Sequence, residues 1–103
     1  MGNFEIAVMG AIVKLRGDAY GRRIHDILEA DRGTVPMAQV YVGLQRLEDK
    51  GFLKSSLTDP QPVRGGRSKR VYEITGAGAK AFSEQVRAVS ALSGLLRGLP
   101  ART

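Results

Sequence analysis

The sequence predicts a small, mainly α-helical domain with one β-hairpin, and three observations predict that class. Its length of 103 residues is typical of one domain. Apolar side chains recur at helical spacing through the first half of the chain. Apolar and polar residues then alternate, as in β-strands, on both sides of a loop that contains two prolines and a glycine pair. A last stretch with helical spacing follows.

The first helix is expected over residues 4–15, and it is apolar on two sides. We expect Asn3 to cap its start and Gly17 to end it in a left-handed conformation. One apolar stripe faces the helix's own domain. The second stripe consists of Ile6, Met9 and Val13. A helix apolar over so much of its surface needs partners on more than one side, which favours contact with a second chain.

The second helix is expected between a cap at Asp18 and a stop at Gly33. After a short connector, Pro36 suits the first position of a third helix, where its missing N–H has no cost. This third helix ends at Gly51 and directs three apolar side chains to the core, namely Val40, Leu44 and Leu47.

Strand-like alternation marks residues 53–58 and 70–74, which form one hairpin around the loop. Thr75 is the expected cap of a last helix over residues 76–98, about 33 Å long. Its apolar seam consists of Phe82, Val86, Val89, Ser93 and Leu96, with Leu92, Leu95 and Leu99 beside it.

The small body cannot cover so long a helix, so we expect a homodimer. The expected dimer interface consists of Phe4, Ile6, Met9, Val13, Phe82, Val86, Val89, Leu92, Leu95 and Leu96.

This order of elements is that of a winged helix-turn-helix. Residues 1–75 would form the DNA-binding domain, with residues 53–74 as its wing, and residues 76–103 a dimerisation helix. The third helix suits the major groove of double-stranded DNA. Its outward residues are Ala38, Gln39, Val42, Gln45 and Arg46. A basic loop suits phosphates or a minor groove, and it contains Arg64, Gly65, Gly66, Arg67, Lys69 and Arg70. Arg22 and Arg23 of the second helix can add phosphate contacts.

The charge balance agrees with this interpretation. Lys and Arg number 16 and Asp and Glu 10, which gives a formal charge of +6 and favours an anionic partner. The chain has no cysteine and one histidine, so we expect no metal or other cofactor. The lack of cysteine fits the reducing cytoplasm, and no apolar run is long enough to cross a membrane.

Two patterns that suggest other chemistry have simpler explanations. Residues 76–81 match a loose dinucleotide-binding fingerprint, but no second parallel strand follows, so we assign them to helix initiation and close strand–helix packing. His25 and Asp26 are adjacent on a helix and therefore point about 100° apart. We expect His25 to be an exposed helix residue, and an enzyme is the least favoured class.

The sequence resembles the PadR family of transcriptional regulators, in its compact form with a single C-terminal helix. The resemblance covers about residues 4–82. It rests on Tyr20-Gly21, Val40-Tyr41, Gly51-Phe52-Leu53 and Arg70-Val71-Tyr72-Glu73-Ile74-Thr75. It implies a homodimeric regulator, most often a repressor, that binds a palindromic operator. It also implies DNA contacts from the basic loop and from Met37, Ala38, Gln39 and Tyr41, to which we add Tyr20 beside Arg22.

Two other functions remain open from the sequence. A winged helix can bind an acidic protein through its basic loop, which would leave little affinity for DNA. Alternatively, a small apolar effector can enter the dimer interface and change the spacing of the two DNA-reading helices. The apolar surplus on the first and last helices motivates the second alternative, although plain dimer packing is the favoured explanation of that surplus.

Overall fold

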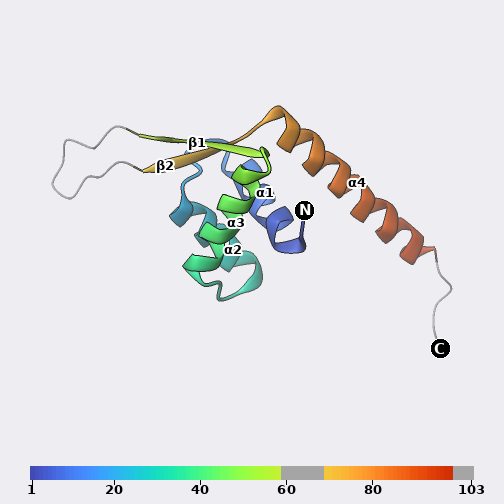
Figure 1. Ribbon diagram of the computed structural model, residues 1–103. Helices are drawn as coiled ribbons and strands as arrows, with labels where there is room; N and C mark the ends of the chain where they lie inside the picture. Colours follow the sequence, from blue (N-terminus) through green and yellow to red (C-terminus); the bar gives the residue numbers. More distant parts are fainter. Residues whose placement is uncertain (59–68, 99–103) are drawn as a thin grey trace.

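A computed structural model of the chain describes residues 1–58 and 69–98. The element order is α1 (Asn3–Leu15), α2 (Gly21–Arg32), α3 (Met37–Asp49), β1 (Leu53–Leu57), β2 (Arg70–Ile74) and α4 (Gly76–Arg97). The two strands pair antiparallel, with Leu53 opposite Ile74 and Ser55 opposite Tyr72. In Figure 1 the hairpin and α4 extend to opposite sides of the three-helix body. The predicted class, a mainly helical fold with one hairpin, is confirmed.

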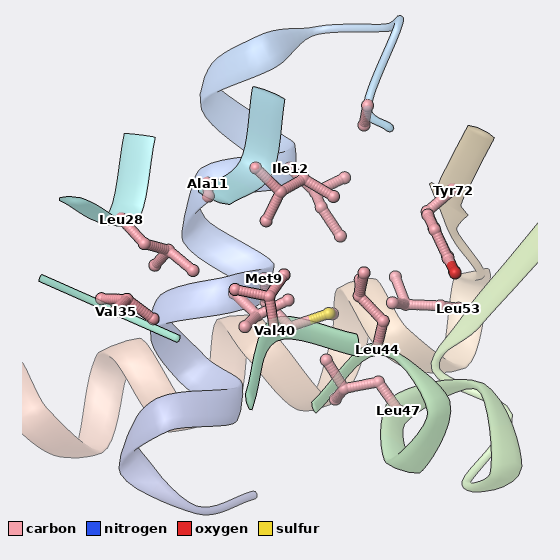
Figure 2. Close-up of a cluster of buried hydrophobic side chains, with 13 residues drawn as sticks. Met9, Ala11, Ile12, Leu28, Val35, Val40, Leu44, Leu47, Leu53 and Tyr72 are labelled. Carbon is pink, nitrogen blue, oxygen red and sulfur yellow. The ribbon is translucent and has the colours of Figure 1, made fainter. Parts of the chain in front are cut away.

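The core lies where α1, α2 and α3 meet the start of the hairpin. The three apolar residues predicted on the inner face of α3, Val40, Leu44 and Leu47, are fully buried. They pack with side chains from α1, α2 and both strands, including Met9, Leu28, Leu53 and Tyr72 (Figure 2). The spacing of apolar residues in the sequence therefore identifies most of the core.

The helix ends differ in detail from the expected caps. Asn3 lies inside α1, and Gly2 occupies the N-cap position without a side-chain bond. At the other end, Arg16 adopts the left-handed conformation expected of Gly17. Helix α2 begins at Gly21, after Tyr20 rather than Asp18, because the chain there is extended and Tyr20 forms a bridge with Val71.

The α2–α3 connector also corrects two expectations. Pro36 is the N-cap of α3 rather than its first helical residue. His25 is half-buried rather than exposed, and its Nε2 donates a hydrogen bond to the Val35 carbonyl oxygen at 2.7 Å. The Glu29 carboxylate accepts a bond from the Val35 backbone N–H at 3.1 Å. Two side chains from α2 therefore bind both backbone polar groups of Val35, its carbonyl oxygen and its N–H, and hold the connector in place. Gly33 does end α2, with a positive φ of 84°.

Helix α4 begins in close contact with the residues that begin the hairpin. The Thr75 hydroxyl accepts a bond from the Gly78 N–H at 3.0 Å, so Thr75 is the predicted cap, and it donates to the Gly51 carbonyl at 2.6 Å. A Cβ atom added to Gly78 would lie 2.0 Å from the Phe52 carbonyl oxygen. The close packing expected around the glycines is therefore found at Gly78, where only hydrogen fits.

Replacing Gly78 with alanine should destabilise the fold by about 3 kcal/mol, because the new methyl group overlaps a backbone carbonyl that must move. Gly76→Ala is the matched control, since no atom lies within 4 Å of its added Cβ. That control should be neutral or stabilising by about 0.5 kcal/mol. Urea unfolding of both variants at one protein concentration measures the difference, and equal midpoints would show that the Gly78 contact is not tight.

An ion pair joins the start of α1 to the end of α3. The Lys50 Nζ donates to Glu5 Oε1 at 2.6 Å, and the Glu5 side chain is only 11% exposed. The hydrogen bond from Lys50 lowers the pKa of Glu5 below its ordinary value, although burial acts in the opposite direction. Because the folded-state pKa is depressed, the pair stabilises the fold at neutral pH, and this contribution is lost as the pH falls through the folded pKa.

Lys50→Gln should therefore lower the free energy of unfolding by about 1–3 kcal/mol at pH 7, because it leaves a mostly buried carboxylate unpaired. The difference from the parent chain should shrink as the pH falls through the depressed folded-state pKa of Glu5, and it should disappear once Glu5 is protonated in both states. Lys54→Gln is the control, since Lys54 pairs with Glu73 at 3.6 Å with both side chains exposed. It should cost about 0.5 kcal/mol or less. A cost for Lys50→Gln that does not change with pH would contradict this role of Glu5.

Candidate nucleic-acid interface

Helix α3 presents one side to solvent beside the wing. Tyr41 and Val42 are both 50% exposed, and Ala38 and Gln45 share their side of the helix and are also exposed. The Gln45 Nε2 donates to Asp49 Oδ1 at 2.9 Å, one turn further along. An exposed helix face of this kind fits the width of the major groove.

Tyr41 lies on the flank of α3 that faces the start of α2. A Cβ atom added to Gly21 would lie 2.8 Å from the Tyr41 hydroxyl oxygen and 3.0 Å from its ring carbon Cζ. The tyrosine ring therefore packs on the bare backbone of Gly21. This contact gives a physical reason for the Tyr20-Gly21 and Val40-Tyr41 pairs that stood out in the sequence.

A hollow of about 460 Å³ opens where α2, α3 and β2 meet. We call it the tyrosine hollow, and it is lined by Tyr20, Gly21, Arg22, Tyr41, Lys69, Arg70 and Tyr72. Five of these residues belong to the predicted DNA-binding set. Gly21 and Tyr72 were missed as site residues, since they stood out in the sequence only as motif residues of the family resemblance. The sequence signal that could have found them is the position of two tyrosines close to basic residues, Tyr20 before Arg22 and Tyr72 after Arg70.

The wing is attached to the body at this hollow. The Tyr72 N–H donates to the Ala19 carbonyl at 2.9 Å, and Tyr20 pairs with Val71 as an isolated antiparallel bridge. Thr58 and Lys69 continue the hairpin beyond the strands, with a backbone bond of 2.8 Å. The segment before α2 thus behaves as a short third strand, and it fixes the position of the wing relative to α2.

The cations of the tyrosine hollow are held in place by weak partners. The Lys69 ammonium lies 4.2 Å from the centre of the Tyr20 ring, a cation–π distance. Arg70 donates to the Ser55 hydroxyl at 2.9 Å. Arg22 lies 3.2 Å from Asp26 with both side chains well exposed. Exposed pairs of this kind contribute little free energy, so the cations can leave these partners for a more strongly bound anion with little loss of stability.

The Tyr72 hydroxyl remains a hydrogen-bond donor at working pH. Burial raises its pKa above the ordinary value for tyrosine, and the Glu48 carboxylate acts in the same direction. Because the neutral phenol is the form favoured by its surroundings, the hydroxyl keeps its proton.

Two predicted α3 residues lie apart from the tyrosine hollow. Gln39 is two positions before Tyr41, so the two side chains point roughly 160° apart around the helix. Gln39 instead borders a separate hollow beside α1, lined also by Asn3, Phe4, Arg32, Thr34 and Val35. Arg46 is exposed on the same flank as Gln39. Gln39 and Arg46 therefore lie on the flank of α3 away from the tyrosine hollow, whereas Tyr41 lines it beside the base of the wing. Ala38, Val42 and Gln45 share the exposed side of α3 with Tyr41. Met37 is half-buried at the start of α3.

The predicted tip of the wing lies outside the described residues. It contains Arg64, Gly65, Gly66 and Arg67. Arg23, on α2, is described, and its guanidinium lies 3.9 Å from Asp18 and 6.0 Å from the Tyr20 ring. It therefore extends the cationic surface from the tyrosine hollow along the start of α2.

The predicted dimer residues fall into two groups. The exposed group contains Val13, Val86, Val89, Leu92, Leu95 and Leu96. Within α4, exposure reaches 73% at Leu95, and Val89, Leu92 and Leu96 are also more than half exposed, so the exposed apolar side chains form a patch. The other group packs in its own protomer: Met9 is fully buried, so its assignment to the interface is wrong, and Phe4, Ile6 and Phe82 are half-buried. Phe82 lies against Gly10 of α1, and Phe4 lies against Gly43 of α3. Leu99 lies outside the described residues.

The parts of the chain that the structure describes contain no group of three or more acidic or histidine side chains able to hold a metal ion. Within those residues, no helix has both the length and the apolar character that a membrane crossing requires.

Three helices, a short turn between the second and third, and an antiparallel hairpin define a winged helix-turn-helix protein. The sequence matches the transcriptional regulator PadR-like family over residues 9–84. The chain belongs to this family, and the resemblance seen in its motifs is confirmed. It is therefore a transcriptional regulator of a DNA-binding class and not an enzyme.

Solved structures with the same fold are similar over nearly the whole chain. A PadR family transcription regulator from Clostridium difficile R20291 superposes with a TM-score of 0.79 at 21% identity, covering 93% of this chain and 96% of that chain. A PadR-like transcription factor from Bacteroides fragilis gives 0.72 at 22% identity, covering 91% and 86%. A PadR-like transcriptional regulator from Bacillus cereus gives 0.70 at 19% identity, covering 93% of each chain. No curated protein sequence matches the chain.

Proposed function

We propose that the protein is a homodimeric repressor that binds a palindromic operator through α3 and the wing. One observation carries the proposal. Tyr41 on the exposed side of α3, Arg22 at the start of α2, and Lys69 and Arg70 at the base of the wing line the one tyrosine hollow. A duplex that accepts α3 in its major groove therefore meets Arg22, Lys69 and Arg70 along its backbone.

The roles of the side chains follow from their chemistry. Gln45 can hydrogen-bond a base edge once it leaves Asp49, and the Val42 and Ala38 side chains can contact thymine methyl groups. The cations supply affinity that does not depend on sequence, because phosphates release condensed counterions when they are paired. Base contacts would thus come from the middle of the exposed face of α3, and phosphate contacts from its edges.

The apolar surface of α4 supports the homodimer. Val89, Leu92 and Leu96 are each more than half exposed on one side of a 22-residue helix. Burial of this surface on a second copy is favourable, and a twofold axis would repeat the DNA-binding face. Two such faces one helical turn apart, about 34 Å, would match a palindrome. A dimer bound over a promoter would exclude RNA polymerase, which is the basis for proposing repression. We place this activity in the cytoplasm.

Selection from genomic fragments, followed by anisotropy titration at about 150 mM salt, tests the proposal. The selected operator should bind at least about 10³-fold more tightly than a shuffled duplex of equal length. Footprinting should show two protected half-sites related by twofold symmetry. Absence of any fragment that competes better than shuffled DNA would reject sequence-specific regulation.

A matched pair of variants locates the reading face. Val42→Asp places a carboxylate on the exposed side of α3 and should lower operator affinity at least about 100-fold through repulsion of DNA phosphates. Ser90→Asp introduces the same group on the polar side of α4 and should leave affinity unchanged. Equal losses from both variants would show that α3 is not the reading element.

A further inference from the structure

All three tyrosines of the chain line the tyrosine hollow. The chain has three tyrosines and no tryptophan, and Tyr20, Tyr41 and Tyr72 come from three different elements to one hollow of about 460 Å³. These residues are far apart in the sequence, so neither local spacing nor helix periodicity explains their meeting. Tyr72 is mostly buried, while Tyr41 is half exposed, which gives the hollow a covered inner end and an open outer edge.

The polar groups of the hollow are suited to an acceptor. Arg22, Lys69 and Arg70 carry three positive charges, and these side chains can donate but cannot accept hydrogen bonds. Tyrosine hydroxyls add further donors. Among the described residues that line the hollow, none is acidic. A base edge presents both donors and acceptors, whereas a phosphodiester presents only acceptor oxygens, so the hollow matches a phosphate better than a base.

We infer that the tyrosine hollow seats one phosphodiester group of duplex DNA, with Tyr41 as a backbone contact rather than a base reader. This inference rests on the proposed function and assigns a role within it. DNA is the source of the phosphate because the hollow shares Tyr41 with the exposed side of α3 and Lys69 with the wing. A duplex backbone that borders the groove around α3 therefore passes over the hollow.

The contact between Lys69 and Tyr20 gives the site a resting state. Without DNA, the ammonium lies 4.2 Å from the Tyr20 ring centre, so its charge is partly stabilised by the aromatic face. A phosphate at the mouth of the hollow draws this ammonium toward the oxygens, and the Tyr20 ring is left free to contact the neighbouring deoxyribose. The exchange predicts a changed environment for Tyr20 and Tyr41 on binding DNA of any sequence.

Fluorine NMR of the full chain labelled with 3-fluorotyrosine tests directly whether the tyrosine hollow binds a DNA phosphate. Only three signals will appear, all from the tyrosine hollow, and Tyr→Phe variants assign them. A shuffled duplex should shift the Tyr20 and Tyr41 signals, and the Tyr72 signal less. Inorganic phosphate and thymidine 5′-monophosphate serve as probes for a free anion. Shifts caused by either free anion at millimolar concentration, without shifts from duplex, would overturn the assignment to DNA.

Binding measurements separate backbone contact from base reading. Tyr41→Phe should lower affinity about fivefold for operator and shuffled duplex alike, leaving their ratio unchanged. Val42→Ala should lower operator affinity selectively. A fall in the ratio for Tyr41→Phe would show that Tyr41 reads a base and would overturn the inference.

The salt dependence provides a second readout. Lys69→Gln should reduce the slope of log K against log salt by about 0.9 for each protomer. Lys80→Gln, an exposed lysine on α4, is the matched control and should leave the slope unchanged. An unchanged slope for Lys69→Gln, with normal operator binding, would reject the phosphate seat and leave the proposed function intact. Conversely, tyrosine shifts with shuffled DNA in the absence of any selectable operator would support the phosphate site and reject the proposed sequence-specific function.

Discussion

Leu92→Asp is expected to convert the protein to monomers and to lower operator affinity by about 10²–10⁴-fold. The leucine is 57% exposed in the single protomer, near the middle of the apolar side of α4. In a dimer it would be buried, and an unpaired carboxylate there is costly. Monomers bind each half-site separately and lose the gain in effective concentration that a linked second site provides. Sedimentation equilibrium should give the mass of a single chain, 11.1 kDa.

Ser90→Asp is the control for this substitution because it adds the same charge to the same helix on its polar side. It should remain dimeric and bind operator normally. Circular dichroism should show that both variants keep their helices, since the core residues lie elsewhere. A Leu92→Asp chain that stays dimeric would mean that α4 does not form the dimer interface through its leucines.

Operator affinity should fall by about three orders of magnitude between 50 and 200 mM salt. Each protomer presents Arg22, Lys69 and Arg70 at the tyrosine hollow and Arg23 near Tyr20, and a dimer would double this set. Neutralising roughly six phosphates with these groups gives a slope near −5 for log K against log salt. The basic residues predicted at the wing tip would make the slope steeper. Anisotropy titrations at four salt concentrations measure it.

Two double variants distinguish the DNA-facing cations from the overall charge. Arg22→Gln with Arg23→Gln should make the slope less steep by about two to four for a dimer. Arg87→Gln with Arg97→Gln removes the same charge from exposed positions of α4 and should change the slope little. Equal slopes for both double variants would indicate that only net charge attracts DNA, and that α2 makes no phosphate contact.

The sequence predicts the architecture well because the burial of one side of each element leaves a clear period. Val40, Leu44 and Leu47 share one face of α3, and all three are fully buried. The switch from helical to alternating spacing places both strands correctly, and their pairing follows. The cap at Thr75 and the stop at Gly33 also rest on local chemistry, so they too are predictable.

The features that the sequence does not predict depend on contacts between distant residues. The start of α2 shifts from Asp18 to Gly21 because Tyr20 pairs with Val71 in the wing. Met9 lies on the second stripe of α1, but the domain's own helices surround α1 closely enough to bury it. His25 is held by the Val35 carbonyl, ten residues away. Similarly, the tyrosine hollow exists only once α2, α3 and β2 have packed together.

The fit of Gly78 against Phe52 has a consequence for how operators can differ between related regulators. Together with the Thr75 bond to Gly51, this contact orients the start of α4 relative to the wing, and the helix extends about 33 Å from it. A tilt of about 10° there would displace the far end of α4 by about 6 Å, which is nearly two base-pair steps. In the proposed dimer, small changes in side-chain size around residues 52 and 78 would therefore select a different half-site separation, without altering any residue proposed to touch a base.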